Sequence, residues 1–528
     1  MTALDLNSPV AVVGAGTMGQ GIAQVALVAG HPVRLYDTVP GRAREAVGAI
    51  GARLGRLVEK ERLTVGERDA ARSRLAAVED LAGLGGCALV AEAVVERLEV
   101  KQELLRALED VVGDDCLFAT NTSSLSVTAI GGALRVPGRL VGLHFFNPAP
   151  LLPLVEVVSG SATDGSSATR AYDTARAWGK TPVACADTPG FLVNRIARPF
   201  YTEAFAVYES RGADPATVDA VLRECGGFRM GAFELTDLIG QDVNESVTHS
   251  VWRSFFQDAR FAPSLAQRRL VESGRLGRKS GRGWYDYRDG AERPEPHTAA
   301  PAGPPPYLVV HGDLGGPAAE LVAMVREAGI EVREAGAEVR EAGIDDVREA
   351  GAEVREGGEP GGARLVLPGG GDLRLADGRT CAESGDAVRF DLALDYRRAT
   401  RVALSTGPGT RPATLREATG LFQALGKKVS VIGDVPGMIV ARTVARIIDL
   451  AHEAVAKGVA TAEDVDTAMR LGVNYPAGPF EWERSLGPRW AHDLLSALHL
   501  RDPSGRCAPS LALYLHAHAS DQREDRPS

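Results

Sequence analysis

The chain has 528 residues, 45% of them hydrophobic and 24% charged. These are ordinary globular values, and the length suggests three or four domains. The formal net charge is −10 and no long basic stretch is present, so we expect no nucleic-acid partner. No segment approaches about 20 consecutive apolar residues, and the start lacks a signal-peptide pattern, so we expect a cytoplasmic protein that does not bind membranes.

The six cysteines lie far apart in the sequence and include no CxxC pair. This spacing indicates neither a metal knuckle nor a disulfide scaffold. We therefore expect the cysteines to act as small apolar residues in a reducing compartment, and we expect no metal.

The first part of the chain predicts alternating strands and helices. Val10–Val13 leads into a glycine turn, an apolar helix follows over 22–28, and the next strand ends at Asp37. Three further short apolar runs follow, separated by segments of helix length: 88–91, 117–119 and 140–144. This alternation is typical of an α/β Rossmann fold with a doubly wound parallel sheet, which we assign to residues 1–186.

From Asp187 onward the pattern is helical, and it repeats. The segment DTPGFLV at Asp187 returns as DVPGMIV at Asp434, an offset of 247 residues. Each copy continues with an apolar helix and an acidic turn. The simplest account is a pair of duplicated all-helical domains, over 187–290 and 434–528.

A Pro-rich and Ala-rich linker, 291–306, precedes a region that we interpret as a reduced Rossmann-like lobe, 307–433. Its expected elements are the runs 307–310, 321–325, 363–367 and 401–405. The glycine turn of this lobe is only HGDLGG, starting at His311, so we expect no dinucleotide to bind there.

A low-complexity tract, 325–358, repeats the sequence Val-Arg-Glu-Ala-Gly inside that lobe. Its period of seven is compatible with a coiled coil that has Val and Ala on one face. However, a Gly in nearly every repeat costs about 1 kcal/mol of helix stability relative to Ala. The composition favours a solvated insertion without a catalytic role, so deleting residues 331–358 is expected to leave turnover nearly intact.

The glycine turn near the start predicts a dinucleotide site. Gly14, Gly16 and Gly19 form GxGxxG between a strand and a helix, and Thr17 and Met18 complete it. These glycines allow a tight turn, close approach of the pyrophosphate and close helix packing, with the phosphates at the positive helix end. A lone GxGxxG can be an ordinary turn, but the flanking strand and helix favour cofactor binding.

An acidic residue ends the second strand of this region. Asp37 lies 23 residues after Gly14, where a carboxylate accepts the ribose hydroxyls and repels a 2′-phosphate. We therefore expect NAD rather than NADP. The alternative stays open because three arginines are close in sequence: Arg34, Arg42 and Arg44.

Polar residues follow two successive predicted strands. Ser123 lies in NTSSL and His144 begins HFFNP, while Glu156 comes 12 residues after the histidine, on a further predicted strand. In an open α/β sheet, ligands bind beyond the carboxyl ends of the strands. Taken singly, these residues suit a helix cap, a core histidine and a solvated strand residue. Together they provide a donor, a base and an orienting carboxylate for alcohol oxidation.

Several motifs resemble the 3-hydroxyacyl-CoA dehydrogenase family across residues 9–287: GAGTMGQGIAQ, AEAVVERLEVKQ, NTSSL, HFFNPAPLLPLVEVV, DTPGFLVNRI and GRKSGRGWYDY. The whole chain is similar to the longer bacterial members. This resemblance implies NAD-dependent oxidation of a (3S)-hydroxyacyl-CoA thioester to 3-oxoacyl-CoA, in phenylacetate or fatty-acid degradation. It leaves 3-hydroxyadipyl-CoA and 3-hydroxybutyryl-CoA as candidate substrates.

The resemblance also implies catalytic roles. His144 would be the base and Glu156 its partner. Ser123 would donate a hydrogen bond to the substrate oxygen, and Asn194 would help to hold the thioester portion and the histidine.

Further matches concern binding. Asn147 would lie near the nicotinamide, and Glu96 and Lys101 match positions that contact the cofactor. Lys60 matches a residue that reaches the phosphates of CoA, although a lysine on a helix face is often merely solvated.

The second copy departs from the pattern, because Ala441 stands where the first copy has Asn194 and no HFFNP precedes it. The second half is therefore expected to be structural, with one active site per chain. Since the helical domain makes the dimer contact in the family, the resemblance leaves open a homodimer or a pseudo-dimer within one chain.

Two other functions remain as alternatives: another β-hydroxyacid dehydrogenase, which would use a catalytic lysine on a helix, and a non-catalytic homologue of the fold. A dicarboxylic acyl group would need a cation at the far end of its pocket. The candidates are Arg195, Arg198 and Arg229.

Overall fold

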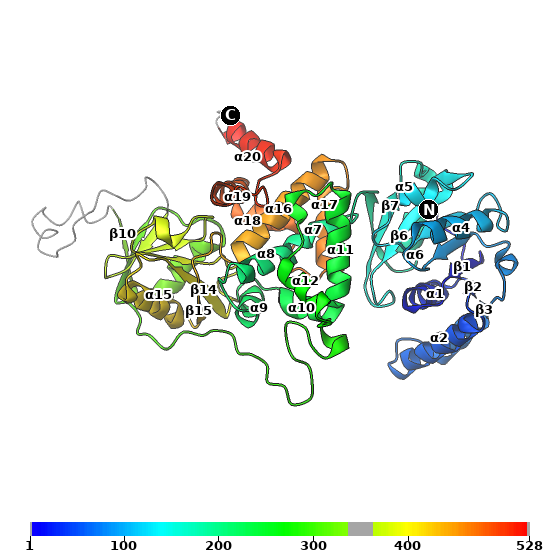
Figure 1. Cartoon of the computed structure of the whole chain (residues 1–528), viewed down its shortest axis with the longest axis horizontal. Coiled ribbons are helices and arrows are strands. Elements are labelled where there is room, and N and C mark those ends of the chain that lie inside the picture. Colours follow the sequence, from blue (N-terminus) through cyan, green and yellow to red (C-terminus); the bar gives the residue numbers. More distant parts are fainter. Residues whose placement is uncertain (1–2, 336–362, 525–528) are drawn as a thin grey trace, which may run out of the picture. The chain divides into compact units, whose positions relative to one another are not determined.

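The protein is described here by a computed structural model that covers residues 3–335 and 363–524 (Figure 1). It divides into two compact units, and each combines segments from both halves of the sequence. The first unit consists of Met1–Arg195 and Ala454–Val473, and the second of Ile196–Glu453 and Asn474–Ser528. The first unit therefore includes part of the segment expected to form the second helical domain.

An eight-stranded sheet forms the centre of the first unit, with the order β3-β2-β1-β4-β5-β6-β7-β8. Its strands are β1 (Val10–Val13), β2 (Val33–Tyr36), β3 (Leu75–Ala77), β4 (Leu89–Glu92), β5 (Leu117–Thr120), β6 (Leu140–Phe145), β7 (Leu154–Ser159) and β8 (Thr181–Ala186). The predicted parallel sheet is confirmed from β3 to β6, but β7 runs antiparallel to β6. The connection between them is a short loop, which cannot hold the crossover helix that a parallel pair needs.

Helices pack on this sheet, and β1, β4, β5 and β6 are buried at every position, as strands covered on both faces are. The helices of the first unit are α1 (Thr17–Ala29), α2 (Arg42–Glu59), α3 (Val65–Ser73), α4 (Leu98–Glu109), α5 (Val127–Gly131), α6 (Gly165–Ala177), α7 (Val193–Ile196) and α17 (Ala462–Gly472). Helix α17 packs on β7 and β8. A Cβ on Gly472 would lie 2.7 Å from a methyl group of Leu154, so this close approach requires glycine.

A mixed sheet of seven strands lies in the second unit, with the order β10-β9-β11-β12-β13-β14-β15. Its strands are β9 (Tyr307–His311), β10 (Glu331–Glu334), β11 (Arg364–Val366), β12 (Asp372–Leu375), β13 (Ala387–Phe390), β14 (Arg401–Thr406) and β15 (Lys428–Ile432). The strands expected near 307, 363 and 401 are thus confirmed.

The second unit is otherwise helical. Its helices are α8 (Arg198–Glu209), α9 (Pro215–Glu224), α10 (Ala232–Ile239), α11 (Gln241–Ser254), α12 (Leu265–Glu272), α13 (Glu320–Glu327), α15 (Pro412–Ala424), α16 (Val440–Ala456), α18 (Pro479–Leu486), α19 (Trp490–Arg501) and α20 (Leu511–Glu524). Helix α9 packs on β14. At its end, the carbonyl of Glu224 accepts a hydrogen bond of 2.9 Å from the backbone N–H of Thr400, and the Glu224 carboxylate accepts one of 3.1 Å from Arg401.

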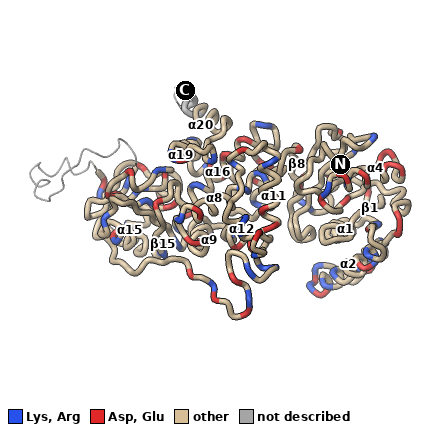
Figure 2. Tube along the Cα trace, viewed as in Figure 1, with Lys and Arg blue, Asp and Glu red and all other residues tan. Residues whose placement is uncertain are grey.

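Charges of both signs are mixed along the described chain, for example on α2, which carries both Arg and Glu (Figure 2). Within the described ranges, no helix is both long and apolar enough to span a bilayer.

The low-complexity tract was expected to be a solvated insertion over 325–358, and this expectation is wrong for its first residues. Val325 is 1% exposed on α13, and β10 pairs in parallel with β9, so that Val332 lies beside Leu308. The first repeats therefore supply a buried helix position and an edge strand, although their composition matches the rest of the tract. Residues 336–358 lie outside the described part of the chain.

Deletion of residues 336–358, which keeps β10, is expected to leave kcat and KM unchanged, because the remaining repeats carry a glycine in almost every copy. The matched control is deletion of 331–358, which also removes the edge strand and should lower the soluble yield. Steady-state kinetics and the yield of soluble protein measure both effects. Loss of soluble protein from the shorter deletion would contradict the prediction.

Candidate functional site

The glycine turn lies between β1 and α1, at the carboxyl edge of the first sheet. Gly14 has a φ of +100°, and a Cβ there would lie 2.5 Å from the carbonyl oxygen of Ala93. A Cβ on Gly19 would lie 1.7 Å from the carbonyl oxygen of Gly14. Gly16 differs, because no atom lies within 4 Å of the place of its Cβ. Since exposed Thr17 begins α1 beside it, the turn offers an open cradle and a helix N-terminus to a pyrophosphate.

Asp37 follows β2 and is tied to this turn. Its Oδ2 accepts a hydrogen bond of 2.8 Å from the backbone N–H of Ala15, and its Oδ1 accepts one of 2.9 Å from that of Val39. The carboxylate is thus held where a ribose would meet the turn. The residues present therefore fit a dinucleotide.

The three arginines near Asp37 in sequence lie in different places. Arg34 donates to the carbonyl oxygens of Gly83 and Gly85, and Arg44 pairs with Glu79. Arg42 has its Nε 4.0 Å from Oδ2 of Asp37. Of the three, Arg42 is the cation that could reach a 2′-phosphate.

A buried ion pair that the sequence did not indicate lies beside the turn. Glu92, the last residue of β4, is 0% exposed, and Lys101 on α4 is 1% exposed. The Nζ of Lys101 lies 3.0 and 2.9 Å from the two carboxylate oxygens of Glu92 and 3.3 Å from Glu96. The Thr120 hydroxyl also donates to Glu92.

Glu96 in turn fixes the loop that carries Ser123. Its Oε1 accepts hydrogen bonds from the Thr122 hydroxyl at 2.6 Å and from the backbone N–H groups of Ser123 and Ser124 at 3.0 and 3.1 Å. Burial alone would raise the pKa of Glu96, but the Lys101 ammonium and these donors outweigh it and lower the pKa. Direct contacts of Glu96 and Lys101 with the cofactor stay predictions, and the geometry adds a positioning role.

The histidine and carboxylate expected to act together are neighbours on β6 and β7. His144 lies opposite Glu156 in the antiparallel register, and its Nδ1 is 2.5 Å from Oε2 of Glu156. The carboxylate of Glu156 is fully buried, and the histidine is 6% exposed. Such a pair fixes the orientation of the ring and the nitrogen that carries the proton.

The second oxygen of Glu156 anchors the chain that carries Asn194. Oε1 accepts hydrogen bonds of 3.1 and 2.8 Å from the backbone N–H groups of Leu192 and Val193. Asn194 follows directly on α7 and is partly exposed. Glu156 therefore positions both the base and the expected donor.

The loops after β5 and β6 leave the sheet at the same edge, because Thr120 pairs with Gly142 in parallel register. The side-chain oxygen of Asn121 accepts a hydrogen bond of 2.8 Å from the backbone N–H of Phe145, which joins the two loops. Ser123 and His144 are thus carried by linked segments at the carboxyl edge of the sheet, although His144 lies within β6 rather than after it.

Lys60 ends α2 and lines a cavity of about 230 Å³ together with Thr17 and Asn147. The same helix presents Arg53 and Arg56 to this cavity. Burial, and then the charge of Arg56, lower the pKa of Arg53. Binding of CoA phosphates by Lys60 stays a prediction, and the i, i+3, i+7 spacing of Arg53, Arg56 and Lys60 was the signal that could have grouped these three cations on one helix face.

The second unit has a corresponding edge with different residues. Leu154 pairs with Thr181 in the first sheet, and Arg401 pairs with Lys428, 247 residues further on, in the second. By this correspondence, Asp391 stands at the place of His144.

Asp391 holds the backbone rather than an imidazole. Its carboxylate accepts hydrogen bonds of 3.0, 2.8 and 3.1 Å from the backbone N–H groups of Ile439, Val440 and Ala441. Burial raises its pKa to about 6 despite these donors. Ala403, opposite it, takes the place of Glu156. Among the described residues of this edge, Asp391 and Ala403 thus stand where the first sheet has His144 and Glu156, and one active site per chain stays a prediction.

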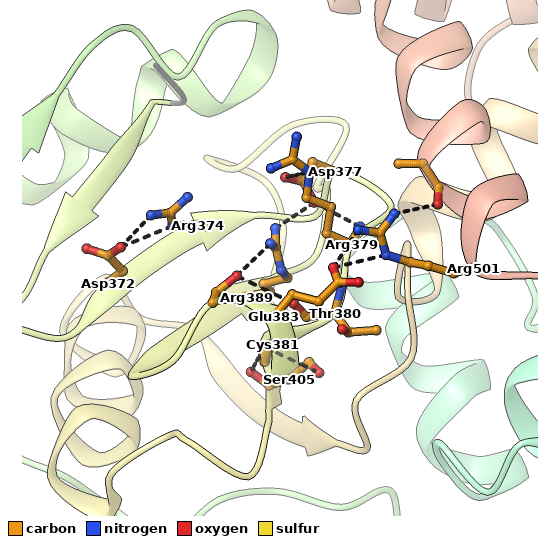
Figure 3. Close-up of polar contacts among 12 residues, drawn as sticks. Asp372, Arg374, Asp377, Arg379, Thr380, Cys381, Glu383, Arg389, Ser405 and Arg501 are labelled. Atoms are coloured by element: carbon orange, nitrogen blue, oxygen red, sulfur yellow. Dashed lines mark hydrogen bonds and ion pairs between the residues drawn. The ribbon is translucent and has the colours of Figure 1, made fainter. Parts of the chain in front are cut away.

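Ion pairs lie on β12 and β13 of this second sheet, on the segment between these strands and at the end of α19 (Figure 3). Arg374 pairs with Asp372 at 2.6 Å, Arg389 pairs with Asp377 at 2.6 Å, and Arg501 binds Glu383. These charges are satisfied within the protein, as in a structural layer.

The chain matches family models over most of its length. The NAD binding domain of 3-hydroxyacyl-CoA dehydrogenase matches residues 9–188, and the C-terminal domain of 3-hydroxyacyl-CoA dehydrogenase matches twice, at 190–287 and 437–523. The 3-hydroxybutyryl-CoA dehydrogenase reduced Rossmann-fold domain matches residues 373–436.

Named relatives agree with these matches. The chain is 42% identical to a 3-hydroxyadipyl-CoA dehydrogenase of Escherichia coli over 483 residues, 90% of each chain. It is 36% identical to the mitochondrial hydroxyacyl-coenzyme A dehydrogenase of Homo sapiens, over 53% of this chain and 91% of that one. A crystal structure of 3-hydroxybutyryl-CoA dehydrogenase from Escherichia coli is similar with a TM-score of 0.85 and 38% identity, covering 98% of this chain and 100% of that one.

Proposed function

Because the chain belongs to the 3-hydroxyacyl-CoA dehydrogenase family, we propose that it oxidises (3S)-hydroxyacyl-CoA to 3-oxoacyl-CoA with NAD⁺. The observation that carries this proposal is the 2.5 Å contact between His144 and the buried carboxylate of Glu156, at the sheet edge that also carries the glycine turn. Another β-hydroxyacid dehydrogenase would need a helix lysine as base. Lys101 on α4 is held in a buried ion pair, which disfavours that alternative.

The contact with Glu156 determines which nitrogen of His144 acts. A carboxylate only accepts hydrogen bonds, so Nδ1 of His144 carries the proton and Nε2 keeps its lone pair. Nε2 takes the proton of the substrate hydroxyl, and the positive imidazolium that results is stabilised by the adjacent negative carboxylate.

NAD⁺, when bound, supplies the acceptor for the hydride that leaves C3 of the substrate. The O–H proton goes to His144 and the C–H electron pair leaves with the hydride, so a C=O bond forms and the reaction balances. Ser123 donates a hydrogen bond to the substrate oxygen, and Asn194 donates to the thioester portion. Arg53, Arg56 and Lys60 attract the phosphates of CoA.

Formation of NADH from 3-hydroxybutyryl-CoA tests the proposal directly. The wild type should reduce NAD⁺ and the His144→Gln variant should be strongly impaired, while both bind NADH. A wild type that binds NADH but turns over no 3-hydroxyacyl-CoA would overturn the function and favour a non-catalytic homologue.

We further propose that the acyl group is 3-hydroxyadipyl, in phenylacetate or fatty-acid degradation, with 3-hydroxybutyryl as the alternative. Support comes from the name of the relative that is 42% identical over 90% of each chain. Among the arginines considered for the distal carboxylate, Arg195 and Arg198 are buried and Arg229 is exposed, 3.3 Å from Asn474. Steady-state kinetics should give a higher kcat/KM for 3-hydroxyadipyl-CoA than for 3-hydroxybutyryl-CoA. Replacing the arginine that binds the distal carboxylate should remove this difference and leave kcat/KM for 3-hydroxybutyryl-CoA unchanged.

Cofactor choice gives a further prediction. Asp37→Ala should weaken NAD⁺ use and narrow the gap with NADP⁺, because it removes the charge that repels a 2′-phosphate and leaves Arg42 beside the ribose. The kcat/KM values for both cofactors measure this. Arg44→Ala, whose partner is Glu79, is the matched control and should change neither value. A wild type that already prefers NADP⁺ would refute the assignment to NAD.

The two halves also form, we infer, a pseudo-dimer within one chain. Support comes from the offset of 247 residues and from an exchange of helices, since α17 of the second half packs on β7 and β8 while α9 of the first half packs on β14. A protease site inserted in the linker 291–306 tests this. After cleavage the two fragments should elute together and keep their activity, whereas separation without denaturant would exclude the exchange.

A further inference from the structure

Three side chains from three helices of the second unit converge at one point. His452 lies on α16, Glu483 on α18 and His516 on α20. The Nε2 of His452 lies 2.6 Å from Oε1 of Glu483, and the Nε2 of His516 lies 3.3 Å from the same oxygen. One nitrogen from each ring and one carboxylate oxygen lie within 4.8 Å of one another.

The surroundings of this cluster are partly closed. His452 and Glu483 are buried, and the His452 ring packs against Phe480 with centroids 5.0 Å apart. The side chain of His516 is 40% exposed, so solvent and ions can reach the cluster from its side. The two imidazole rings lie 4.4 Å apart. Two ring nitrogens thus point at one carboxylate oxygen from a short distance.

We propose that His452, Glu483 and His516 bind a Zn²⁺ ion. Two imidazole nitrogens and one carboxylate oxygen are a usual ligand set for Zn²⁺, whereas Mg²⁺ and Ca²⁺ prefer oxygen alone. Tetrahedral ligands at the usual Zn–N length of about 2.0 Å lie about 3.3 Å apart. The separation of 3.3 Å between His516 and Glu483 equals this value, whereas the 2.6 Å between His452 and Glu483 is a hydrogen bond that side-chain rotation must open by about 0.7 Å to admit the ion. Solvent beside His516 supplies a fourth ligand.

The ion would join α20 to the rest of the second helical domain. Each of the three helices provides one ligand, and α20 is the last helix of the described chain. The cluster includes none of the residues assigned to dehydrogenation. A metal that binds only the folded form stabilises it by mass action, so the role is structural.

The test uses the full chain, freed of metal with a chelator and titrated with Zn²⁺ by calorimetry. We expect one Zn²⁺ per chain, a higher melting temperature on binding and unchanged dehydrogenase activity. Cobalt in place of zinc should give the visible absorption of a tetrahedral site. His516→Ala should weaken binding by about tenfold or more, because one of three protein ligands is lost.

His518→Ala is the matched control. It lies on the same helix, two residues further on, and its ring contacts Tyr514 and His492 instead. This variant should bind Zn²⁺ as the wild type does. Absence of binding by the wild type, or equal binding by the His516→Ala variant, overturns the proposal. A Glu483→Gln variant could fail to fold because Glu483 is buried. His516 is partly exposed, so the His516→Ala variant should fold and can be tested for Zn²⁺ binding in any case.

Discussion

Replacing His144 with Gln is expected to lower kcat by about 10²–10⁴, the usual contribution of a positioned general base. At 1.36 kcal/mol per decade, this corresponds to about 3–5 kcal/mol of activation free energy. Gln is polar but cannot accept the proton of the hydroxyl. Binding of NADH should stay nearly unchanged, because the glycine turn and Asp37 would hold the dinucleotide. Steady-state kinetics and an NADH fluorescence titration measure the two effects separately.

Glu156→Gln should lower kcat in the same direction by less. The single side-chain oxygen of Gln can accept either from Nδ1 of His144 or from the N–H groups of Leu192 and Val193, and the negative charge that stabilises the imidazolium is lost, while the His144 ring itself remains. Because His144 and Glu156 act as a unit, the activation free energy lost in the double variant should be far smaller than the sum of the losses in the two single variants. Near-normal kcat in His144→Gln, or losses that simply add, would mean that another residue is the base.

Lys101→Met is expected to lower the free energy of unfolding by about 3–5 kcal/mol, since it leaves the buried carboxylate of Glu92 without its counter-charge. Met has nearly the length of Lys, so the loss reflects charge rather than a cavity. The Ser123 loop should loosen as well, because Glu96 loses the same partner. Thermal and denaturant unfolding, followed by a probe of the first unit, measure the loss.

The matched control is Arg44→Met. Arg44 also pairs with a glutamate, Glu79, but both side chains are well exposed, and such pairs contribute little to stability. A double variant, Glu92→Gln with Lys101→Met, should regain much of the stability because no buried charge remains. If the Lys101→Met variant is as stable as the Arg44→Met variant, the ion pair of Glu92 and Lys101 does not contribute the predicted free energy of unfolding.

Local patterns predicted the parts of the site that depend on neighbours in sequence. The glycine turn follows from its spacing between a strand and a helix, and His144 was expected at the carboxyl end of a strand, where the structure places it near the end of β6. The role of Glu156 as the partner of His144 came from the resemblance to the dehydrogenase family, whereas the antiparallel pairing of β6 and β7 that places them opposite each other was not predicted. The glycine turn and His144 each lie within a few residues of the strand from which they were predicted.

The sequence could not predict features that depend on distant segments. Glu92 reads as the last residue of an apolar strand, and only the approach of α4 shows that its charge is matched by Lys101. Asp391 reads as an ordinary acid, and only the register of β13 and β14 places it where His144 stands in the first sheet. The strand β10 was missed because its residues share the composition of the repeat tract around them.

The position of α17 on β7 and β8 has a consequence for the gene. The first unit includes residues Ala454–Val473, which contain α17. A reading frame that stops after the first helical domain therefore encodes a chain without α17, in which Leu154 loses its contact with Gly472. Recombination at the linker would separate each sheet from the helix that covers it. Within this single chain, the complete cover of the first sheet therefore requires the sequence up to Val473.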